Sequence, residues 1–347
     1  MTRRDCALTL AALLGGRSLL ARQQPDQNQS GPGPGEDSSP VIRVNVDLVN
    51  ILFTVHKKHG GELVPNLTKD DFTVFEDGKQ QTIERFSRDT DLPLTLGLLV
   101  DVSASQMNLI EIERDAASAF FGSVIRPKDE AFLITFGKDT ELLQDYTSSP
   151  HLLRAALGQM RGDEVGGPMM GRSPLPNTNP GPIPTSGNPK GTLLYDAIYL
   201  AANEKLKSEV GRKAVVLITD GEDQGSYYSR NQATESAQRA NAIIYSIYYV
   251  DPWFYRQYGG FGGGDESGLR KMSDETGGRV FTVKKNHTLQ EVFKEIQDEM
   301  RSQYSIGYRS TKPERDGSYR KIEIKTADKD DVVQARKGYY ATPNDAG

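Results

Sequence analysis

The chain has 347 residues, a formal net charge of −5 and an apolar content of 36%, with 34 Gly and 18 Pro. A chain of this length can hold two domains, and its many glycines and prolines predict long loops. The mild negative charge provides no basic surface for nucleic acid, so nucleic-acid binding is not expected.

The first 21 residues have the features of a secretory signal peptide. Arg3 and Arg4 give a basic start, a short apolar stretch follows, and a small residue stands at Ala21. The stretch is shorter than a bilayer span, and the alternative is an uncleaved anchor or a frayed helix. Cleavage would remove Cys6, the one cysteine, and would exclude disulfides and Cys-ligated zinc. We therefore expect export to the periplasm, the cell surface or the medium.

Residues 22–40 are rich in Gln, Gly, Pro and Ser and predict a disordered linker. Alternating apolar and polar residues then predict β-strands in residues 41–90. His56 and His59 fall in a predicted turn, and no third nitrogen or thiolate ligand lies near them in sequence, so we expect a solvated turn there rather than a metal site. The strands are expected at Val41–Val49, Ile51–Val55, Phe72–Gln80 (with a turn at Asp77-Gly78) and Gln81–Ser87.

Residues 91–303 alternate between strand and helix patterns, which predicts a doubly wound, mainly parallel α/β sheet with helices on both faces. The segments Gly162–Lys190 and Asp251–Gly264 are expected to be loops. Strands are expected at Leu94–Asp101, Glu130–Phe136, Glu141–Tyr146, Lys213–Asp220, Ile243–Val250 and Arg279–Val283. Helices are expected at Asn108–Ile125, His151–Met160, Thr192–Leu206, Arg230–Ala240, Gly268–Thr276 and Leu289–Arg301.

Residues 304–342 return to strand patterns, at Tyr304–Tyr308, Tyr319–Lys325 and Val332–Arg336. Neither this set nor the set in residues 41–90 is large enough for an independent sandwich. We therefore expect the two sets to pair into one Ig-like accessory β-domain, with the α/β domain inserted between them.

Oxygen-bearing side chains follow two of the buried strands. Asp101, Ser103 and Ser105 come at the end of Leu94–Asp101, and Asp220 ends Lys213–Asp220. Thr192 stands at the start of a predicted helix. Ligands in open α/β sheets bind at the carboxyl ends of the strands. Carboxylates and hydroxyls without His or Cys suit a hard cation, and small hydroxyls suit octahedral Mg²⁺ better than Ca²⁺. The alternative is that Asp101 and Asp220 only cap helices.

These segments resemble the metal-ion-dependent adhesion site of a von Willebrand factor A (VWFA) domain, over roughly residues 91–304. The flanking pieces Phe72–Lys79 and Arg336–Tyr340 further resemble a bacterial group of secreted VWFA-related proteins that is common in acidobacteria. The resemblance implies five metal ligands, with Mg²⁺ bound and Mn²⁺ or Ca²⁺ as alternatives, and a position left open for a partner's carboxylate. Ala104 and Gln106 depart from the family pattern but remove no ligand. The implied ligands are Asp101, Ser103, Ser105, Thr192 and Asp220.

The function expected from this pattern is metal-dependent binding of a protein partner, without catalysis or a small-molecule substrate. One alternative is a metal-dependent hydrolase with Asp101 as nucleophile, but the chain shows no phosphate-binding loop, no Gly-x-Ser-x-Gly elbow and no His in the site segments. Another is a VWA subunit of a larger, ATPase-coupled complex, which export argues against. Aromatic residues expected on the same rim are candidate partner contacts: Trp253, Phe254, Tyr255 and Tyr258.

Overall fold

The computed structural model describes residues 48–88, 92–162, 191–258 and 264–342. The predicted signal peptide and linker, the start of the strand expected from Val41 and nearly all of the Gly162–Lys190 loop lie outside these residues. The described residues form three sheets, one mainly parallel and two antiparallel.

The mainly parallel sheet has six strands in the order β10-β9-β8-β5-β6-β7. Its neighbouring strands run parallel except for β7, which pairs with β6 in the antiparallel direction. The central strand is β5, all eight residues of which are buried. The strands are β5 (Leu94–Asp101), β6 (Glu130–Phe136), β7 (Thr140–Thr147), β8 (Arg212–Thr219), β9 (Ala242–Tyr248) and β10 (Val280–Thr282).

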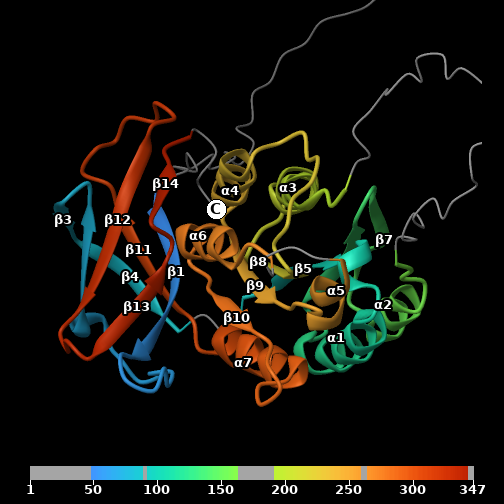
Figure 1. Ribbon diagram of the computed structural model, residues 1–347. Coiled ribbons are helices and arrows are strands. Elements are labelled where there is room, and N and C mark those ends of the chain that lie inside the picture. Colours follow the sequence, from blue (N-terminus) through green and yellow to red (C-terminus); the bar gives the residue numbers. More distant parts are fainter. Residues whose placement is uncertain (1–47, 89–91, 163–190, 259–263, 343–347) are drawn as a thin grey trace, which may run out of the picture. The chain divides into compact units, whose positions relative to one another are not determined.

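Helices cover both faces of this sheet, as the strand–helix alternation predicts. Alternate residues of β5 point to opposite faces. Leu98 belongs to the apolar cluster that includes residues of α1, α2 and α7, and Leu99 to the cluster that includes residues of α3, α4 and α6. Figure 1 shows these two groups of helices on either side of the sheet. The helices are α1 (Ile110–Val124), α2 (Pro150–Leu157), α3 (Leu194–Leu200, continued by a π-helical turn at Ala201–Leu206), α4 (Arg230–Arg239), α5 (Pro252–Tyr258), α6 (Glu266–Thr276) and α7 (Leu289–Arg301), with 3₁₀ turns at Lys69–Asp71 and Ala104–Gln106.

The tight packing of β5 makes Gly97 a sensitive position. A Cβ added to Gly97 would lie 2.4 Å from the Phe132 ring on β6. We expect Gly97→Ala to lower the free energy of unfolding by about 1–3 kcal/mol, because the core is overpacked. Gly122→Ala on α1 is the matched control, since a Cβ there meets no atom within 4 Å. Denaturant unfolding checks both variants, and equal stabilities would contradict this packing of β5 on β6.

The two antiparallel sheets combine strands from both ends of the described chain. In the first, β1 lies between β11 and β13, and in the second, β12 lies between β2 and β14. Phe53, Val74, Ile306 and Ile322 belong to their shared apolar core. The predicted pairing of N- and C-terminal strands into an accessory β-domain is therefore confirmed. The strands are β1 (Leu48–Lys57), β2 (Phe72–Glu76), β3 (Lys79–Gln81), β4 (Ile83–Ser87), β11 (Tyr304–Arg309), β12 (Tyr319–Thr326), β13 (Asp331–Ala335) and β14 (Gly338–Tyr340).

Two local predictions are wrong. His56 does not lie in a solvated turn: it is a buried residue of β1, and its ring nitrogens hydrogen-bond the Thr54 hydroxyl at 3.1 Å and the Gly61 carbonyl at 3.1 Å. The segment after Asp251 is not a loop throughout, because Pro252–Tyr258 forms α5. Asp251 starts this helix by accepting a 2.8 Å hydrogen bond from the backbone N–H of Trp253.

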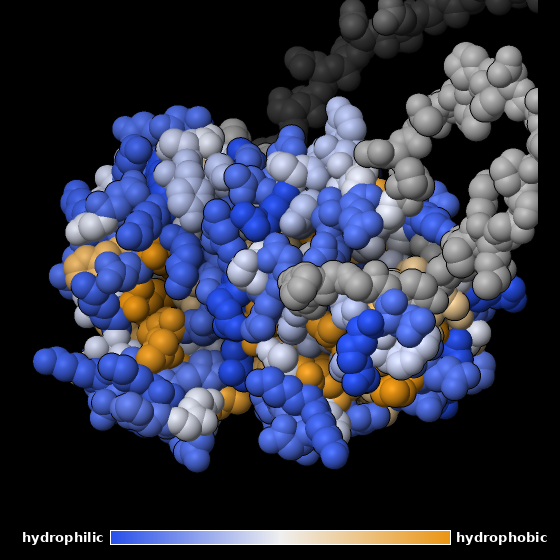
Figure 2. All heavy atoms as spheres, viewed as in Figure 1, coloured by the Kyte–Doolittle hydropathy of each residue, from blue (hydrophilic) through white to orange (hydrophobic). Residues whose placement is uncertain are grey.

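Most of the surface in Figure 2 is hydrophilic. Orange, apolar patches interrupt it over the accessory β-domain and in the region of α1 and α5. Exposed apolar side chains in the described residues include Trp253 of α5, Met107, Ile112 of α1 and Val332 of β13. No helix among the described residues combines the length and apolarity needed to span a bilayer.

Candidate metal centre

The candidate centre lies where β5 and β8 end. These strands are adjacent and parallel, so their carboxyl ends meet at one edge of the sheet. Asp101 is the last residue of β5, and Asp220 directly follows β8. Both carboxylates are fully buried. Gly221 turns the chain after Asp220 with φ of 85°, and a Cβ there would lie 2.6 Å from the Asp265 carbonyl oxygen.

Hydrogen bonds join four of the five predicted ligands into one cluster. The Ser103 and Ser105 hydroxyl oxygens are 3.1 Å apart, and the Ser105 hydroxyl donates to Asp220 Oδ2 at 2.6 Å. The Ser103 backbone N–H donates to Asp101 Oδ1 at 2.9 Å. The structure therefore brings together residues that lie more than a hundred positions apart in the sequence.

The fifth predicted ligand, Thr192, is held next to the β8 loop by its backbone. The Gly191 N–H donates to the Gln224 carbonyl at 2.7 Å, and the Gln224 N–H donates to the Thr192 carbonyl at 2.8 Å. Gln224 is four residues beyond Asp220, so the two segments form one rim. Thr192 is buried and precedes α3, which begins at Leu194 rather than at the predicted Thr192.

Two carboxylates that are buried away from water determine the electrostatics of the centre. Burial, and then the neighbouring Asp220 carboxylate, raise the pKa of Asp101 to about 7. Hydrogen bonds from Ser103 and Thr219 act in the opposite direction. Among the described residues, no ion pair to Lys, Arg or His involves Asp101 or Asp220. A divalent cation would supply the positive charge that the protein does not.

The donor set fits a hard divalent cation. In the described part of the chain, no group of three or more His, Cys, Asp and Glu side chains could hold a metal. A metal at this edge would therefore depend on the hydroxyls of Ser103, Ser105 and Thr192 beside the two carboxylates. Such an all-oxygen set is the type that Mg²⁺ and Ca²⁺ accept and that softer metals do not require.

The predicted aromatic contacts are distributed over α5. Trp253 is 52% exposed, whereas Phe254 and Tyr255 are half-buried. The Tyr255 hydroxyl donates to Asp220 Oδ2 at 2.9 Å, which places α5 directly against the candidate centre. Burial and the Asp220 charge raise the pKa of Tyr255, so it stays a neutral donor. The side chain of Tyr258 lies outside the described part.

Three further residues support the centre, and none of them is a predicted ligand. The Thr219 hydroxyl donates to Asp101 Oδ2 at 2.6 Å and accepts the Gly221 N–H at 3.0 Å. Gln106 is fully buried, and its side-chain amide donates to the Tyr249 carbonyl at 3.2 Å. This hydrogen bond connects the loop after β5 to the segment before α5. Thr219 adjoins Asp220 in the motif, and that adjacency is the one sequence signal for its role.

Glu113 is the third such residue. It lies in the first turn of α1, where the helix dipole favours an anion, yet it is fully buried. Its two carboxylate oxygens have no hydrogen-bond partner among the described residues. Burial raises its pKa well above the ordinary value, and the charges of Asp101 and Asp220 raise it further. Glu113 is therefore a buried carboxyl group whose charged form is disfavoured.

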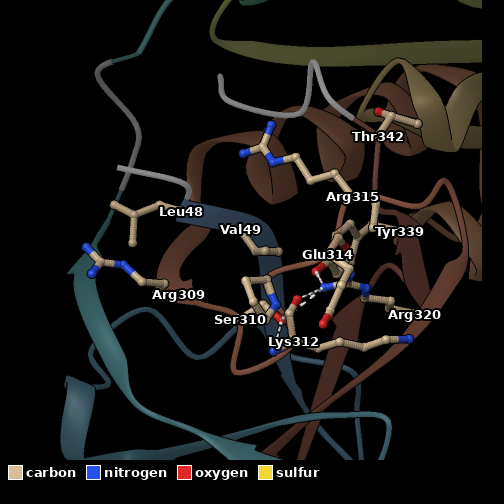
Figure 3. Close-up of a pocket in the computed structure, with 12 residues that line it drawn as sticks. Leu48, Val49, Arg309, Ser310, Lys312, Glu314, Arg315, Arg320, Tyr339 and Thr342 are labelled. Carbon is tan, nitrogen blue, oxygen red and sulfur yellow. Dashed lines mark hydrogen bonds between the residues drawn. The ribbon is translucent and has the colours of Figure 1, made fainter. Parts of the chain in front are cut away.

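A separate cavity of about 120 Å³ lies in the accessory β-domain. Figure 3 shows Arg320 beside Ser310, Lys312 and Glu314 at this cavity. The Arg320 guanidinium donates to the backbone carbonyls of Lys312 and Glu314, so its charge holds the cavity wall in place. None of the five predicted metal ligands lines the cavity.

Comparison with known families agrees with this geometry. Residues 185–295 match the family model of the von Willebrand factor type A domain. The chain carries a VWA domain. The match includes Thr192 and Asp220 and begins after the segment with Asp101, Ser103 and Ser105. A hydrogen bond from Ser105 joins that segment to Asp220. A search of curated proteins found no match.

Several solved structures are similar to this chain. One is an aerotolerance-related membrane protein from Bacteroides fragilis, at 17% identity and a TM-score of 0.42, covering 60% of this chain and 98% of that one. BatB from Bacteroides thetaiotaomicron has 16% identity and a TM-score of 0.42, covering 60% and 97%. Proximal thread matrix protein 1 from the mussel byssus, with a zinc-occupied MIDAS motif, has 15% identity and a TM-score of 0.45, covering 65% and 50%.

Proposed function

We propose that this VWA-domain protein is exported and binds a protein partner through a divalent cation, Mg²⁺, at the candidate centre. Five residues would hold the cation: Asp101, Ser103, Ser105, Thr192 and Asp220. The partner would offer a carboxylate to the cation. In this proposal residues 91–303 form the VWA domain, and residues 41–90 and 304–342 form the accessory β-domain.

The observation that carries this proposal is the hydrogen-bonded cluster of Ser103, Ser105 and Asp220 beside Asp101. Helix capping alone would not require these hydroxyls to converge on a buried carboxylate from another strand. Two buried carboxylates without a cationic side chain are costly, and a bound divalent cation offsets that cost. The family supports the same assignment, because VWA domains bind a divalent metal and mediate protein–protein interactions.

When bound, the cation would act as a Lewis acid that attracts an anionic ligand. The residues of the chain perform the remaining tasks. Thr219 and the Ser103 backbone N–H orient the Asp101 carboxylate by hydrogen bonds of 2.6 and 2.9 Å. The Glu222 N–H, at 3.1 Å, and the Ser105 hydroxyl orient Asp220.

A hydrolase that uses Asp101 as its nucleophile is a less well supported function than metal-dependent binding. Both oxygens of the Asp101 carboxylate already accept hydrogen bonds from the protein, and the group is fully buried. A carboxylate nucleophile needs access to its substrate, which full burial withholds from Asp101. VWA domains in general serve adhesion and interaction, in agreement with a binding function.

The experiment that tests the proposal is capture of a partner from the envelope and secreted fractions of the source cells, with the mature protein as bait. We expect a partner to be retained with Mg²⁺, released by EDTA, and lost with Thr192→Val, which removes the buried hydroxyl at nearly constant volume. Tyr227→Phe is the control, because Tyr227 is 86% exposed. Retention that is equal with Mg²⁺, with EDTA and with Thr192→Val would refute metal-dependent binding.

A further inference from the structure

The cavity in the accessory β-domain has room for a small ligand. Its volume is about 120 Å³, whereas one water molecule occupies ~30 Å³ in the liquid. An engineered apolar cavity of roughly 150 Å³ binds benzene, so a cavity of this volume accepts a group close to the size of a benzene ring. None of the proposed metal ligands lines it, so any ligand here binds independently of the metal centre.

Apolar side chains form much of the cavity wall. Tyr339 and Ala341 are buried, and Leu48 and Val49, at the start of β1, are half-buried. An ordered water molecule needs about two to four polar partners, and such a wall provides few. A compact apolar group, in contrast, gains contact with these side chains and loses contact with water. The wall therefore favours an organic ligand over a cluster of water molecules.

One part of the wall carries a buried cation with an unused donor. Arg320 of β12 lines the cavity, and its side chain pairs with Glu76 at 3.4 Å. Nη1 donates to the Ser310 hydroxyl at 3.0 Å, and Nη2 donates to the Glu314 carbonyl. The Arg320 Nε is buried and has no hydrogen-bond partner among the described residues. Buried donors are seldom left unpaired, so Nε is a candidate donor to a ligand.

The charges around the cavity favour an anion. Four of the lining side chains are cationic, and one, that of Glu314, is anionic. Arg309 and Lys312 are exposed, so their charges are available at the opening. A carboxylate suits this site better than a phosphate does, because both Nη atoms of Arg320 already donate to the protein and a phosphate requires more donors. The cationic side chains are those of Arg309, Lys312, Arg315 and Arg320.

Hydrogen bonds hold the cavity open in advance of binding. The Arg320 guanidinium donates to the carbonyls of Lys312 and Glu314 in the loop between β11 and β12 (Figure 3). The Gly317 N–H donates to the Ala341 carbonyl at 2.8 Å, and the Ala341 N–H donates to the Ser318 carbonyl at 2.9 Å. The loop is thus attached both to β12 and to the segment after β14. A ligand would not have to order the loop when it binds.

We propose that this cavity binds a small organic acid, whose compact apolar group packs against Val49 and Tyr339 and whose carboxylate pairs with the Arg320 guanidinium. The acid is either a free molecule or the carboxyl-terminal residue of a peptide, since both present a carboxylate beside a compact apolar group. The accessory β-domain then has a binding function of its own, beyond its pairing of the two ends of the described chain.

Calorimetric titration of the full-length protein with sodium benzoate tests this site. We expect saturable binding to one site, and binding of the neutral analogue benzamide to be at least about tenfold weaker, because it lacks the charge that pairs with Arg320. N-acetyl-leucine mimics the carboxyl-terminal residue of a peptide. Tighter binding of N-acetyl-leucine than of benzoate would identify a peptide end as the ligand, and weaker binding would identify a free acid.

Two variants locate the binding in the cavity. Val49→Phe enlarges a side chain of the wall and should abolish benzoate binding. Arg320→Lys keeps a positive charge beside Glu76 but removes the Nε donor, and should weaken binding about tenfold. Val332→Phe is the matched control for Val49→Phe, because Val332 is 46% exposed on β13 and does not line the cavity. Denaturant unfolding verifies that each variant is folded, and Val49→Phe alone decides the location if Arg320→Lys does not fold.

Three results would overturn the proposed site. Absence of saturable binding by both benzoate and N-acetyl-leucine would mean that the cavity holds water alone. Equal affinities for benzoate and benzamide, or binding of inorganic phosphate in preference to both acids, would contradict recognition of a carboxylate. Benzoate binding that is unchanged in Val49→Phe would place the acid elsewhere on the protein. Each result leaves the metal centre untouched, because benzoate is titrated in the presence of EDTA.

Discussion

In the absence of metal and at neutral pH, the Asp101→Asn variant should be more stable than the wild type. Asp101 is fully buried next to Asp220, and its ionised form is disfavoured by both burial and that neighbour. Asparagine keeps the shape and a carbonyl acceptor but carries no charge. We expect a gain of roughly 2–4 kcal/mol in the free energy of unfolding, the scale of a carboxyl pKa displaced by several units.

The gain in stability of Asp101→Asn over the wild type should increase with pH. The pKa of Asp101 is about 7 in the folded protein and 3.8 without perturbation. The folded state therefore binds the proton more tightly, and this contribution to stability is fully present below pH 3.8 and is lost as pH rises through 7. The advantage of Asp101→Asn should accordingly grow between pH 4 and 7 and remain constant above that range.

Thermal unfolding in EDTA, at several pH values, checks this prediction, and addition of Mg²⁺ provides the contrast. At about a hundred times its dissociation constant, Mg²⁺ should stabilise the wild type by about 2.7 kcal/mol and leave Asp101→Asn unchanged. Asp115→Asn, an exposed position on α1, should behave as the wild type does. A destabilised Asp101→Asn in EDTA would mean that the Asp101 charge has a favourable partner, contrary to this account.

The second large effect is expected in the accessory β-domain, at Glu76. Its carboxylate accepts hydrogen bonds from Tyr308 at 2.7 Å, Ser310 at 2.6 Å and Tyr339 at 3.0 Å, and pairs with Arg320 at 3.4 Å. The side chains of Glu76 and Arg320 are each 2% exposed. Glu76→Ala should lower the free energy of unfolding by about 3–5 kcal/mol, because it leaves a buried guanidinium without its anion.

Glu84→Ala is the matched control for this prediction. Glu84 pairs with Arg309 at 3.8 Å, and the two side chains are 38% and 58% exposed. Loss of such a surface pair should cost less than about 1 kcal/mol. Denaturant unfolding compares the two variants. Similar losses would contradict the buried network, and with it the close pairing of β2, from the N-terminal part, with β12, from the C-terminal part.

Much of the fold could be predicted because the decisive signals are local. The run Leu94–Val100 is apolar apart from Thr95, as expected of a strand covered on both faces, and every residue of β5 is buried. Helix α7 begins and ends at the predicted residues, because a Thr288 capping box precedes an amphipathic stretch. Asp77 and Gly78 both have positive φ, as the predicted hairpin turn demands.

The remaining features were missed for two reasons, an overlooked local signal and tertiary contacts that no local pattern encodes. The aromatic run after Asp251 favours a strand or loop by composition, whereas Asp251 and Pro252 are a helix start, and this signal could have predicted α5. The contact of Tyr255 with Asp220 and the burial of Glu113 arise from tertiary packing. Burial of His56 likewise follows from the position of β1 between β11 and β13.

The central claim is that Asp101 and Asp220, with the adjacent hydroxyls, bind a divalent cation. Calorimetric titration of Mg²⁺ into the metal-free wild type, Asp101→Asn and Asp115→Asn tests it most directly. We predict saturable binding to one site in the wild type and in Asp115→Asn, and none in Asp101→Asn. Absence of binding in the wild type, or equal isotherms for the wild type and Asp101→Asn, would contradict the metal centre.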